Sequence, residues 1–314
     1  MRYTRRDLGK VALATLPMAK AFGVAKINSK FGGVQIGAIS YSFNRIASPD
    51  AAVIIKALVD LGLGEVELTL DHCESLAGIP AAPAGGGRAQ STPEQQAASA
   101  EAHAKIAAWR AAATPATWAA VRKRFEDAGV DVALLSGEMN DRMTDKDIEY
   151  QFSMARGVGV KALNTSTTLT MAKRIAPIAD EHKLRVGYHG HDQTNDPNQT
   201  ATIESYDTLM AYGKFNGVNL DIGHFTAANY DAVAFIQKHH DKITSLHLKD
   251  RKKDHGPNVP WGTGDTPIKE VLLLIKKNKY PIPCNIEWEM AIPQGSDLIA
   301  EMKKCKEFCA KCLA

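Results

Sequence analysis

Four short stretches in the last third of the chain decide its fold: Tyr188-His189-Gly190-His191, Asn219-Leu220-Asp221-Ile222-Gly223-His224, Leu246-His247-Leu248-Lys249-Asp250 and Asn285-Ile286-Glu287-Trp288-Glu289. Each reads as the end of a strand that stops on a polar residue able to ligate a metal. In a parallel α/β architecture the loops after the carboxyl ends of the strands face one side, so residues distant in sequence converge there. The stretches therefore predict a site at one rim of a parallel barrel.

Short apolar runs alternate with amphipathic helical patterns along the whole chain, which is typical of βαβ units and a parallel sheet. The predicted strands are Val34–Tyr41, Glu65–Leu70, Val130–Leu135, Ala162–Thr165, Arg185–His189, Val218–Asp221, Ile243–Leu248 and Pro283–Trp288. A doubly wound sheet would normally stop at five or six strands. We therefore predict a single-domain (β/α)8 TIM barrel over residues 27–314, with an insertion after the second strand.

That insertion covers residues 78–115 and begins with a Pro-, Ala- and Gly-rich run, followed by an Ala-rich helical stretch. Loops after barrel strands lie on the active rim, so the insertion is either a lid or a flexible solubilising loop. Within it, Trp109 and Arg110 have side chains suited to binding a ligand. Both are candidate substrate-binding residues.

The N-terminus carries Thr4-Arg5-Arg6-Asp7-Leu8-Gly9-Lys10, which fits a twin-arginine export signal, and a mostly apolar stretch follows. We interpret residues 1–26 as a targeting segment, with a basic amphipathic first helix as the alternative. The apolar run is interrupted by Lys20 and is too short for a stable membrane span. The expected location is the periplasm.

Composition limits the partners of the protein. The 314 residues are 45% hydrophobic, enough for a sizeable core, and 38 basic against 35 acidic residues give a net charge of +3. This near balance does not suggest a nucleic-acid partner. The five cysteines do not require a disulfide framework, and the oligomeric state is left open.

The strand ends predict a divalent metal ion. Side chains alternate along a strand, so the polar residues at each strand end share the inward face. Asp221, His247 and Glu287 offer the mixed oxygen and nitrogen donors that suit a hard or borderline cation. The fourth ligand comes from His189 or Glu67, and His189 could instead bind a sugar hydroxyl.

Catalytic candidates lie beside these ligands. Lys249 can stabilise an enolate oxygen or act as a base, or it can simply pair with an acidic neighbour. Glu67 can be a ligand, a base or a partner of Lys249, whereas Glu289 can exchange roles with Glu287. His191 is a further candidate, either supporting the ligands or contacting substrate.

Two further residues are candidates for substrate binding. His224 follows Asp221 by three residues and could touch a ligand held by the metal, or it could cap the next helix. Trp261, in the Trp261-Gly262-Thr263-Gly264-Asp265 loop, could stack on a sugar ring, with a plain glycine-rich turn as the alternative.

Six motifs together resemble those of the sugar phosphate isomerase/epimerase superfamily, the xylose isomerase-like TIM barrels. They are the Glu65-Val66-Glu67 strand, the His-Gly-His of strand five, Asp221-Ile-Gly-His224, His247-Leu-Lys-Asp250, the Trp-Gly-Thr-Gly-Asp loop and the Ile-Glu-Trp-Glu of strand eight. The resemblance covers residues 34–298. It implies a divalent metal, manganese first and magnesium, cobalt or zinc as alternatives, held by strands five to eight. The family's fifth-strand ligand is a glutamate, where this chain has His189. That His-Gly-His form looks more like an exported branch of the superfamily.

The resemblance implies an enzyme that removes a proton beside the carbonyl of a keto-sugar, as isomerases and epimerases do. The missing fifth-strand glutamate leaves open a lyase or hydratase that eliminates the aglycone from 3-keto-glycosides. Two other classes are an exported carbohydrate-binding barrel without catalysis and a nuclease like endonuclease IV. The nuclease needs several metals and a basic DNA-facing surface, which the sequence does not suggest.

Overall fold

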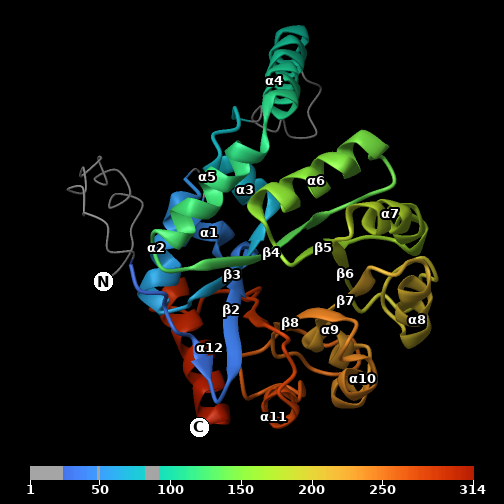
Figure 1. The fold of residues 1–314 in the computed structure, drawn as a ribbon. Helices are drawn as coiled ribbons and strands as arrows, with labels where there is room; N and C mark the ends of the chain where they lie inside the picture. The colour runs from blue at the N-terminus through green and yellow to red at the C-terminus, as the bar shows by residue number, and fades with distance from the viewer. Residues whose placement is uncertain (1–23, 48–49, 82–91) are drawn as a thin grey trace.

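The computed structural model describes residues 24–47, 50–81 and 92–314, and in it eight parallel strands close into a barrel (Figure 1). The strands are β2 (Val34–Ile39), β3 (Glu65–Thr69), β4 (Asp131–Glu138), β5 (Ala162–Ser166), β6 (Arg185–His189), β7 (Asn216–Asp221), β8 (Ile243–Leu248) and β9 (Cys284–Ile286). Closure comes from the pairing of β9 with β2, and a short β1 (Lys30–Phe31) runs antiparallel to β2. The predicted (β/α)8 barrel is confirmed.

Helices surround the barrel and follow its strands in turn (Figure 1). They are α1 (Asn44–Ala47), α2 (Ala52–Leu61), α3 (Leu70–Leu76), α4 (Pro93–Ala112), α5 (Pro115–Glu126), α6 (Asp145–Val158), α7 (Leu169–His182), α8 (Ile203–Ala211), α9 (Ile222–Ala227), α10 (Ala232–His239), α11 (Ile268–Asn278) and α12 (Leu298–Leu313). The last helix, α12, packs against α2, so the two ends of the barrel domain support each other.

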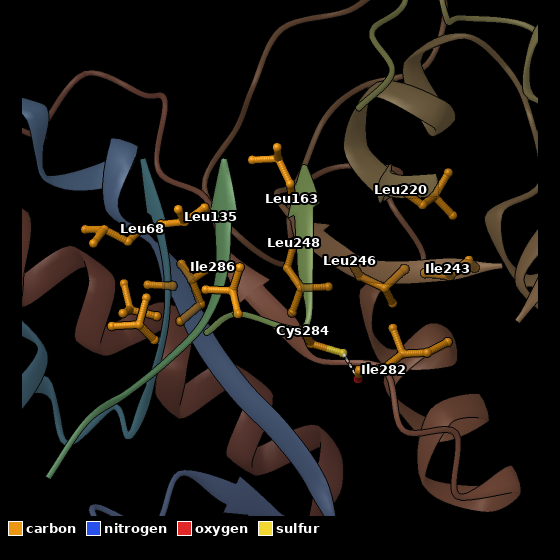
Figure 2. Close-up of a cluster of buried hydrophobic side chains, with 14 of the residues drawn as sticks. Leu68, Leu135, Leu163, Leu220, Ile243, Leu246, Leu248, Ile282, Cys284 and Ile286 are labelled. Atoms are coloured by element: carbon orange, nitrogen blue, oxygen red, sulfur yellow. Dashed lines mark hydrogen bonds between the residues drawn. The ribbon is translucent and has the colours of Figure 1, made fainter. Parts of the chain in front are cut away.

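Successive side chains along each strand alternate between the hydrophobic core and the polar interior of the barrel. The apolar residues of the strands, such as Leu246 and Leu248 of β8, are fully buried in the hydrophobic core (Figure 2). Their polar neighbours Ser245 and His247 bond to side chains of other strands inside the barrel. Burial of the apolar set contributes roughly 25 cal/mol per Å² and fixes the register that turns the polar set inward.

The insertion after β3 contains α4, a helix of 20 residues that points away from the barrel (Figure 1). Thr92 caps its first turn by accepting a hydrogen bond from the backbone of Gln95, and Pro93 occupies the first position. Its C-terminal turn returns to the barrel, where Arg110 makes a bidentate ion pair with Glu74 at 2.7 and 2.8 Å. The insertion is therefore anchored at this end.

The predicted targeting segment, residues 1–26, lies almost wholly outside the described residues. Within the described ranges, no helix is both long enough and apolar enough to cross a membrane.

The buried carboxyl of Glu65, at the start of β3, should make the stability of the protein depend on pH. Burial raises its pKa to about 7, and its Oε1 has no hydrogen-bond partner among the described residues. The carboxyl of Glu65 titrates near 4.5 in the unfolded chain, so the folded protein binds this proton more tightly. The free energy of unfolding therefore falls as the pH rises from about 4.5 through about 7.

The variant Glu65→Gln lacks this titration. Between about pH 4.5 and 7 the free energy of unfolding of the variant should rise relative to that of the wild type. Above pH 7 this relative gain should reach up to about 3 kcal/mol. Urea unfolding of both proteins at pH 5 and pH 8 measures the effect. An equal difference in unfolding free energy at both pH values would contradict it.

Candidate metal centre

Four residues predicted as ligands come together at the carboxyl ends of the last four strands. His189 ends β6, Asp221 ends β7, His247 lies in β8 and Glu287 directly follows β9. One donor atom from each lies within 4.8 Å of the others, and all four residues are buried. In the ladder His247 pairs with Asp221 on one side and with Asn285 on the other, so the register brings the ligand positions into line.

Three of these residues have a buried polar atom for which no hydrogen-bond partner exists among the described residues: Asp221 Oδ2, His247 Nδ1 and Glu287 Oε2. Lys249 Nζ approaches the two oxygens at 2.9 and 2.8 Å without hydrogen-bond geometry. Buried polar atoms are normally satisfied, so three converging exceptions need an explanation. His247 Nδ1 also lies 3.2 Å from Glu287 Oε2. Two converging carboxylates and two imidazoles are a set of side chains that suits a divalent cation.

The tautomer of His189 suits ligation. Its Nδ1 lies 2.7 Å from Asn219 Oδ1, and the amide nitrogen of Asn219 donates to Ser245, so the oxygen must accept and Nδ1 must donate. This leaves the Nε2 lone pair free. Burial, and next the charge of His247, lower the pKa of His189 to about 4, so the ring is neutral as a metal ligand must be.

The sequence between the two histidines is constrained by close packing. A Cβ at Gly190 would lie 1.8 Å from the Tyr206 hydroxyl, so only glycine fits there. Gly223, beside Asp221, has the same role, because a Cβ would lie 2.3 Å from Cγ of Lys249. The glycines of the His-Gly-His and Asp-Ile-Gly-His motifs thus allow neighbouring strand ends to approach.

Glu67 holds the opposite face of His247. His247 Nε2 donates to Glu67 Oε2 at 3.0 Å, and Asn164 and Asn285 donate to the same carboxylate at 2.9 and 2.8 Å. Burial raises the pKa of Glu67, but the charge of His247 and these hydrogen bonds outweigh it, and the pKa lies below its ordinary value. Glu67 is fully buried and does not line the cavity, so it orients a ligand and does not face substrate.

The ammonium of Lys249 is surrounded by carboxylates. It lies 2.6 Å from Glu289 in addition to its contacts with Asp221 and Glu287. Burial lowers the pKa of Lys249, but the three carboxylates raise it above its ordinary value. For Glu287, burial raises the pKa, but Lys249 and His247 hold it well below its usual range. At neutral pH Lys249 and Glu287 are therefore ionised.

A cavity of about 490 Å³ opens above the four residues. His189, His247 and Glu287 lie in its wall, together with the predicted His191, Glu289 and Arg110. Burial, and next the neighbouring His189, lower the pKa of His191 to about 3. The cavity thus brings together the neutral imidazoles of His189 and His191, the ionised carboxylate of Glu287 and the guanidinium of Arg110.

Two predicted substrate-binding residues lie elsewhere. Trp109 packs edge-on against Trp118, with ring centroids 5.8 Å apart, and is not part of the cavity wall. Trp261 packs against Phe308 of α12 at 5.9 Å and lines a separate hollow. At both positions the tryptophan ring packs against an aromatic side chain of a helix and does not line the cavity. His224 lies behind the wall, where its ring contacts Lys249.

Several residues of the site were not predicted from the sequence. Tyr41, with 46% of its surface exposed, lines the cavity beside Asn44, but a lone tyrosine after the first strand gives no signal. Asn219 and Asn164 point into the barrel as strand alternation predicts, yet nothing in sequence specified their partners. Arg251 continues the alternation of His247 and Lys249 by one more step, a signal that was available.

The C-terminal half of the chain matches a known family. Residues 166–308, which include all four members of the candidate metal centre, match the family model described as the xylose isomerase-like TIM barrel. Over these residues the chain is similar to the xylose isomerase-like TIM barrels. The family resemblance predicted from the motifs is confirmed, and with it a sugar isomerase/epimerase-like superfamily.

Individual relatives are distant. A probable L-ribulose-5-phosphate 3-epimerase of Mycoplasma pneumoniae is 26% identical over 147 residues, which are 45% of this chain and 46% of that protein. The match thus spans about half of either protein. A sugar phosphate isomerase/epimerase structure from Parabacteroides distasonis has a TM-score of 0.55 at 19% identity, covering 87% of this chain and 96% of that one. The IolI protein with a bound zinc atom has a TM-score of 0.57 at 12% identity, covering 89% and 96%. These two structures show the shared fold.

The contact between Glu67 and His247 generates a test. The variant Glu67→Gln keeps the size of the side chain but replaces an acceptor oxygen by a donor, so His247 loses its orientation. We expect divalent-metal affinity to fall by about 10- to 100-fold, the usual cost of losing a partner that orients a ligand. Calorimetric titration with Mn²⁺ measures it.

Glu289→Gln is the matched control, since it makes the same chemical change at a residue outside the four ligands. It should bind Mn²⁺ within about threefold of the wild type. Equal affinity of all three proteins would remove Glu67 from the metal centre. Circular dichroism of each variant separates loss of binding from loss of folding.

Proposed function

We propose that the protein is a divalent-metal-dependent isomerase or epimerase of keto-sugars that removes a proton from the carbon beside a carbonyl group. The main support is the convergence of three buried atoms that make no hydrogen bond among the described residues, Asp221 Oδ2, His247 Nδ1 and Glu287 Oε2, close to a cavity that also carries acid–base groups. The sugar isomerase/epimerase-like family supports the reaction class.

In this proposal His189, Asp221, His247 and Glu287 hold the cation, with manganese as the first candidate and magnesium, cobalt or zinc as alternatives. A bound divalent cation supplies positive charge that polarises a carbonyl oxygen and stabilises the enediolate. Asn219 and Glu67 keep the two imidazoles in the tautomers that ligation requires.

Glu289 is our candidate for the base. It lies in the cavity wall, and its side chain is 27% exposed, so it can reach substrate, while Lys249 holds it at 2.6 Å. Its carboxylate takes the proton, and the electrons of the broken C–H bond form the carbon–carbon double bond of the enediolate. Return of a proton to the neighbouring carbon gives an isomer, and return to the opposite face gives an epimer. His191, neutral in its buried setting, can bind a substrate hydroxyl.

The charges of the cavity favour a sugar without phosphate. Acidic residues dominate its described wall: Asp71, Glu74, Glu138, Glu287 and Glu289. Among the described wall residues Arg110 is the only lysine or arginine, and Glu74 already binds its guanidinium through two oxygens. Phosphate recognition normally uses free guanidinium, ammonium or clustered backbone amides. A neutral keto-sugar or glycoside fits better and agrees with the proposed export to the periplasm.

A lyase acting on 3-keto-glycosides is the second candidate, for one reason. An epimerase that uses metal-binding glutamates on both faces of its substrate needs one at the end of the fifth barrel strand, where this chain has His189. With a carboxylate base on one side only, the enediolate can instead expel a β-substituent together with its bonding electrons. The first proton-abstraction step is the same for both reactions.

Solvent exchange tests the proposal. The purified protein, loaded with Mn²⁺, is incubated in deuterium oxide with free ketohexoses, their phosphates and 3-keto-glucosides. Deuterium should enter beside the carbonyl of a neutral substrate, and mass spectrometry of the products distinguishes isomer, epimer and eliminated aglycone. Glu289→Gln should slow this exchange by about 10²- to 10⁴-fold while still binding metal.

Metal binding without exchange on any substrate would contradict the enzyme proposal and favour a carbohydrate-binding barrel. Exchange that Glu289→Gln leaves unchanged would assign the base to another residue. Faster exchange with the phosphorylated sugars would overturn the argument from cavity charge.

A further inference from the structure

The cavity beside the candidate metal centre extends across the mouth of the barrel. In the closed strand order, β3 and β4 lie opposite β7 and β8, the strands of Asp221 and His247. The far part of the cavity wall comes from residues that follow β3 and β4, including one residue of the insertion helix α4. Cavities of about 300–1,000 Å³ usually hold drug-sized ligands, which are larger than one sugar ring. A volume of about 490 Å³ therefore leaves room beside a sugar bound at the metal centre.

The insertion helix places one arginine in this far wall and three contacts hold it. Arg110 donates from Nε and Nη2 to the two oxygens of Glu74 at 2.7 and 2.8 Å, and its guanidinium lies 5.6 Å from the centroid of the Tyr150 ring. The hydroxyl of Tyr150 donates to the same carboxylate at 2.7 Å. The Glu74 side chain is 8% exposed, whereas that of Arg110 is 45% exposed. A buried carboxylate thus fixes one edge of an accessible guanidinium.

The other edge of this guanidinium is available to a ligand. An arginine side chain carries five N–H donors in a planar fork and no acceptor. Both hydrogen bonds of Arg110 to Glu74 use Nε and Nη2, so they leave the two N–H groups of Nη1. Because Glu74 balances the positive charge, the remaining donors suit a neutral oxygen, such as that of a sugar hydroxyl.

A buried amide in the same wall supplies an acceptor. Gln151, next to Tyr150 in α6, lines the cavity and is 7% exposed. Its Nε2 donates to the backbone carbonyl of Glu138 at 3.2 Å, which fixes the orientation of the amide. Its Oε1 is buried and has no hydrogen-bond partner among the described residues. Buried polar atoms are normally satisfied, so this oxygen calls for a donor that a ligand would bring.

We propose that Arg110 and Gln151 form a second subsite of the cavity, which binds the hydroxyl groups of a second sugar ring attached to the ring at the metal centre. A hydroxyl group both donates and accepts hydrogen bonds, so a wall that offers N–H donors and an amide oxygen matches a ring with several hydroxyls. The ligand is then a two-ring glycoside and not a free monosaccharide. That the inner ring is the one that reacts rests on the proposed function.

Calorimetric titration with unreactive sugars tests the subsite without any assay of activity. The probes are cellobiose and maltose, each compared with the methyl glucoside of the same anomeric configuration, on protein loaded with Mn²⁺. At least one disaccharide should bind about tenfold or more tightly than its methyl glucoside, because its second ring adds hydrogen bonds to a charged group and a buried amide. The inference is overturned if neither disaccharide binds, or if neither binds more tightly than its methyl glucoside.

Two variants separate the subsite from the rest of the cavity. Arg110→Met removes the donors and Gln151→Leu removes the acceptor. Each should weaken disaccharide binding by about 10- to 100-fold, while the affinities for the methyl glucoside and for Mn²⁺ stay within about threefold of the wild type. Those two affinities also show that the variant is folded. Equal weakening of both sugars, or no weakening of either, would contradict the assignment.

Arg156→Met is the matched control. Arg156 is an exposed arginine of α6 that donates to the backbone carbonyl of His182 at 2.9 Å and does not line the cavity. The variant makes the same chemical change as Arg110→Met and should bind all four sugars as the wild type does.

Kinetics give a second readout on whichever keto-sugars exchange deuterium. Arg110→Met should raise KM for a 3-keto-disaccharide by about 10-fold or more with little change in kcat, and should leave KM for the corresponding 3-keto methyl glucoside within about threefold. Failure of the proposed function would appear as the absence of exchange with every substrate. Failure of this inference would instead appear as disaccharide binding that does not depend on Arg110 or Gln151.

Discussion

A single buried carboxylate, that of Glu67, organises the interior of the barrel. It accepts hydrogen bonds from Asn164 of β5, His247 of β8 and Asn285 of β9, so four strands that are distant in sequence meet at one group. A buried charge without such partners would cost several kcal/mol, and removing one partner leaves that cost uncompensated. The polar centre is therefore stable only when all its members are present. The same bonds that satisfy Glu67 also fix the imidazole of His247 at the metal centre.

A chain of hydrogen bonds runs outward from Glu67 and orients further side chains of the site. Ser245 joins Asn164 to Asn219, and Asn219 in turn orients His189. The outer loops repeat the principle, with Asp192 and Arg251 around His224. The imidazoles of His189, His247 and His224 are thus each contacted by a polar residue that does not line the cavity. Such prior orientation lets a site act on substrate without reorganising its own dipoles.

Most of the fold and the four candidate ligands could be predicted because strand alternation and parallel topology are local and general rules. Lys249, Glu289 and His191 lie around the predicted centre for the same reason. The rules fail where tertiary packing decides, since Trp109 and Trp261 look like ligand-binding residues but pack on Trp118 and Phe308. The role of Glu67 was equally hidden, because three interpretations fitted its position and only its partners distinguish them.

The central claim is that His189, Asp221, His247 and Glu287 hold one divalent ion. Anomalous X-ray diffraction from crystals of the full chain grown with Mn²⁺ tests it most directly. The account predicts one anomalous peak per chain, about 2.0–2.3 Å from His189 Nε2, Asp221 Oδ2, His247 Nδ1 and Glu287 Oε2. A peak among His189, His191 and His224 instead, or none at either place in crystals that contain manganese, would contradict it.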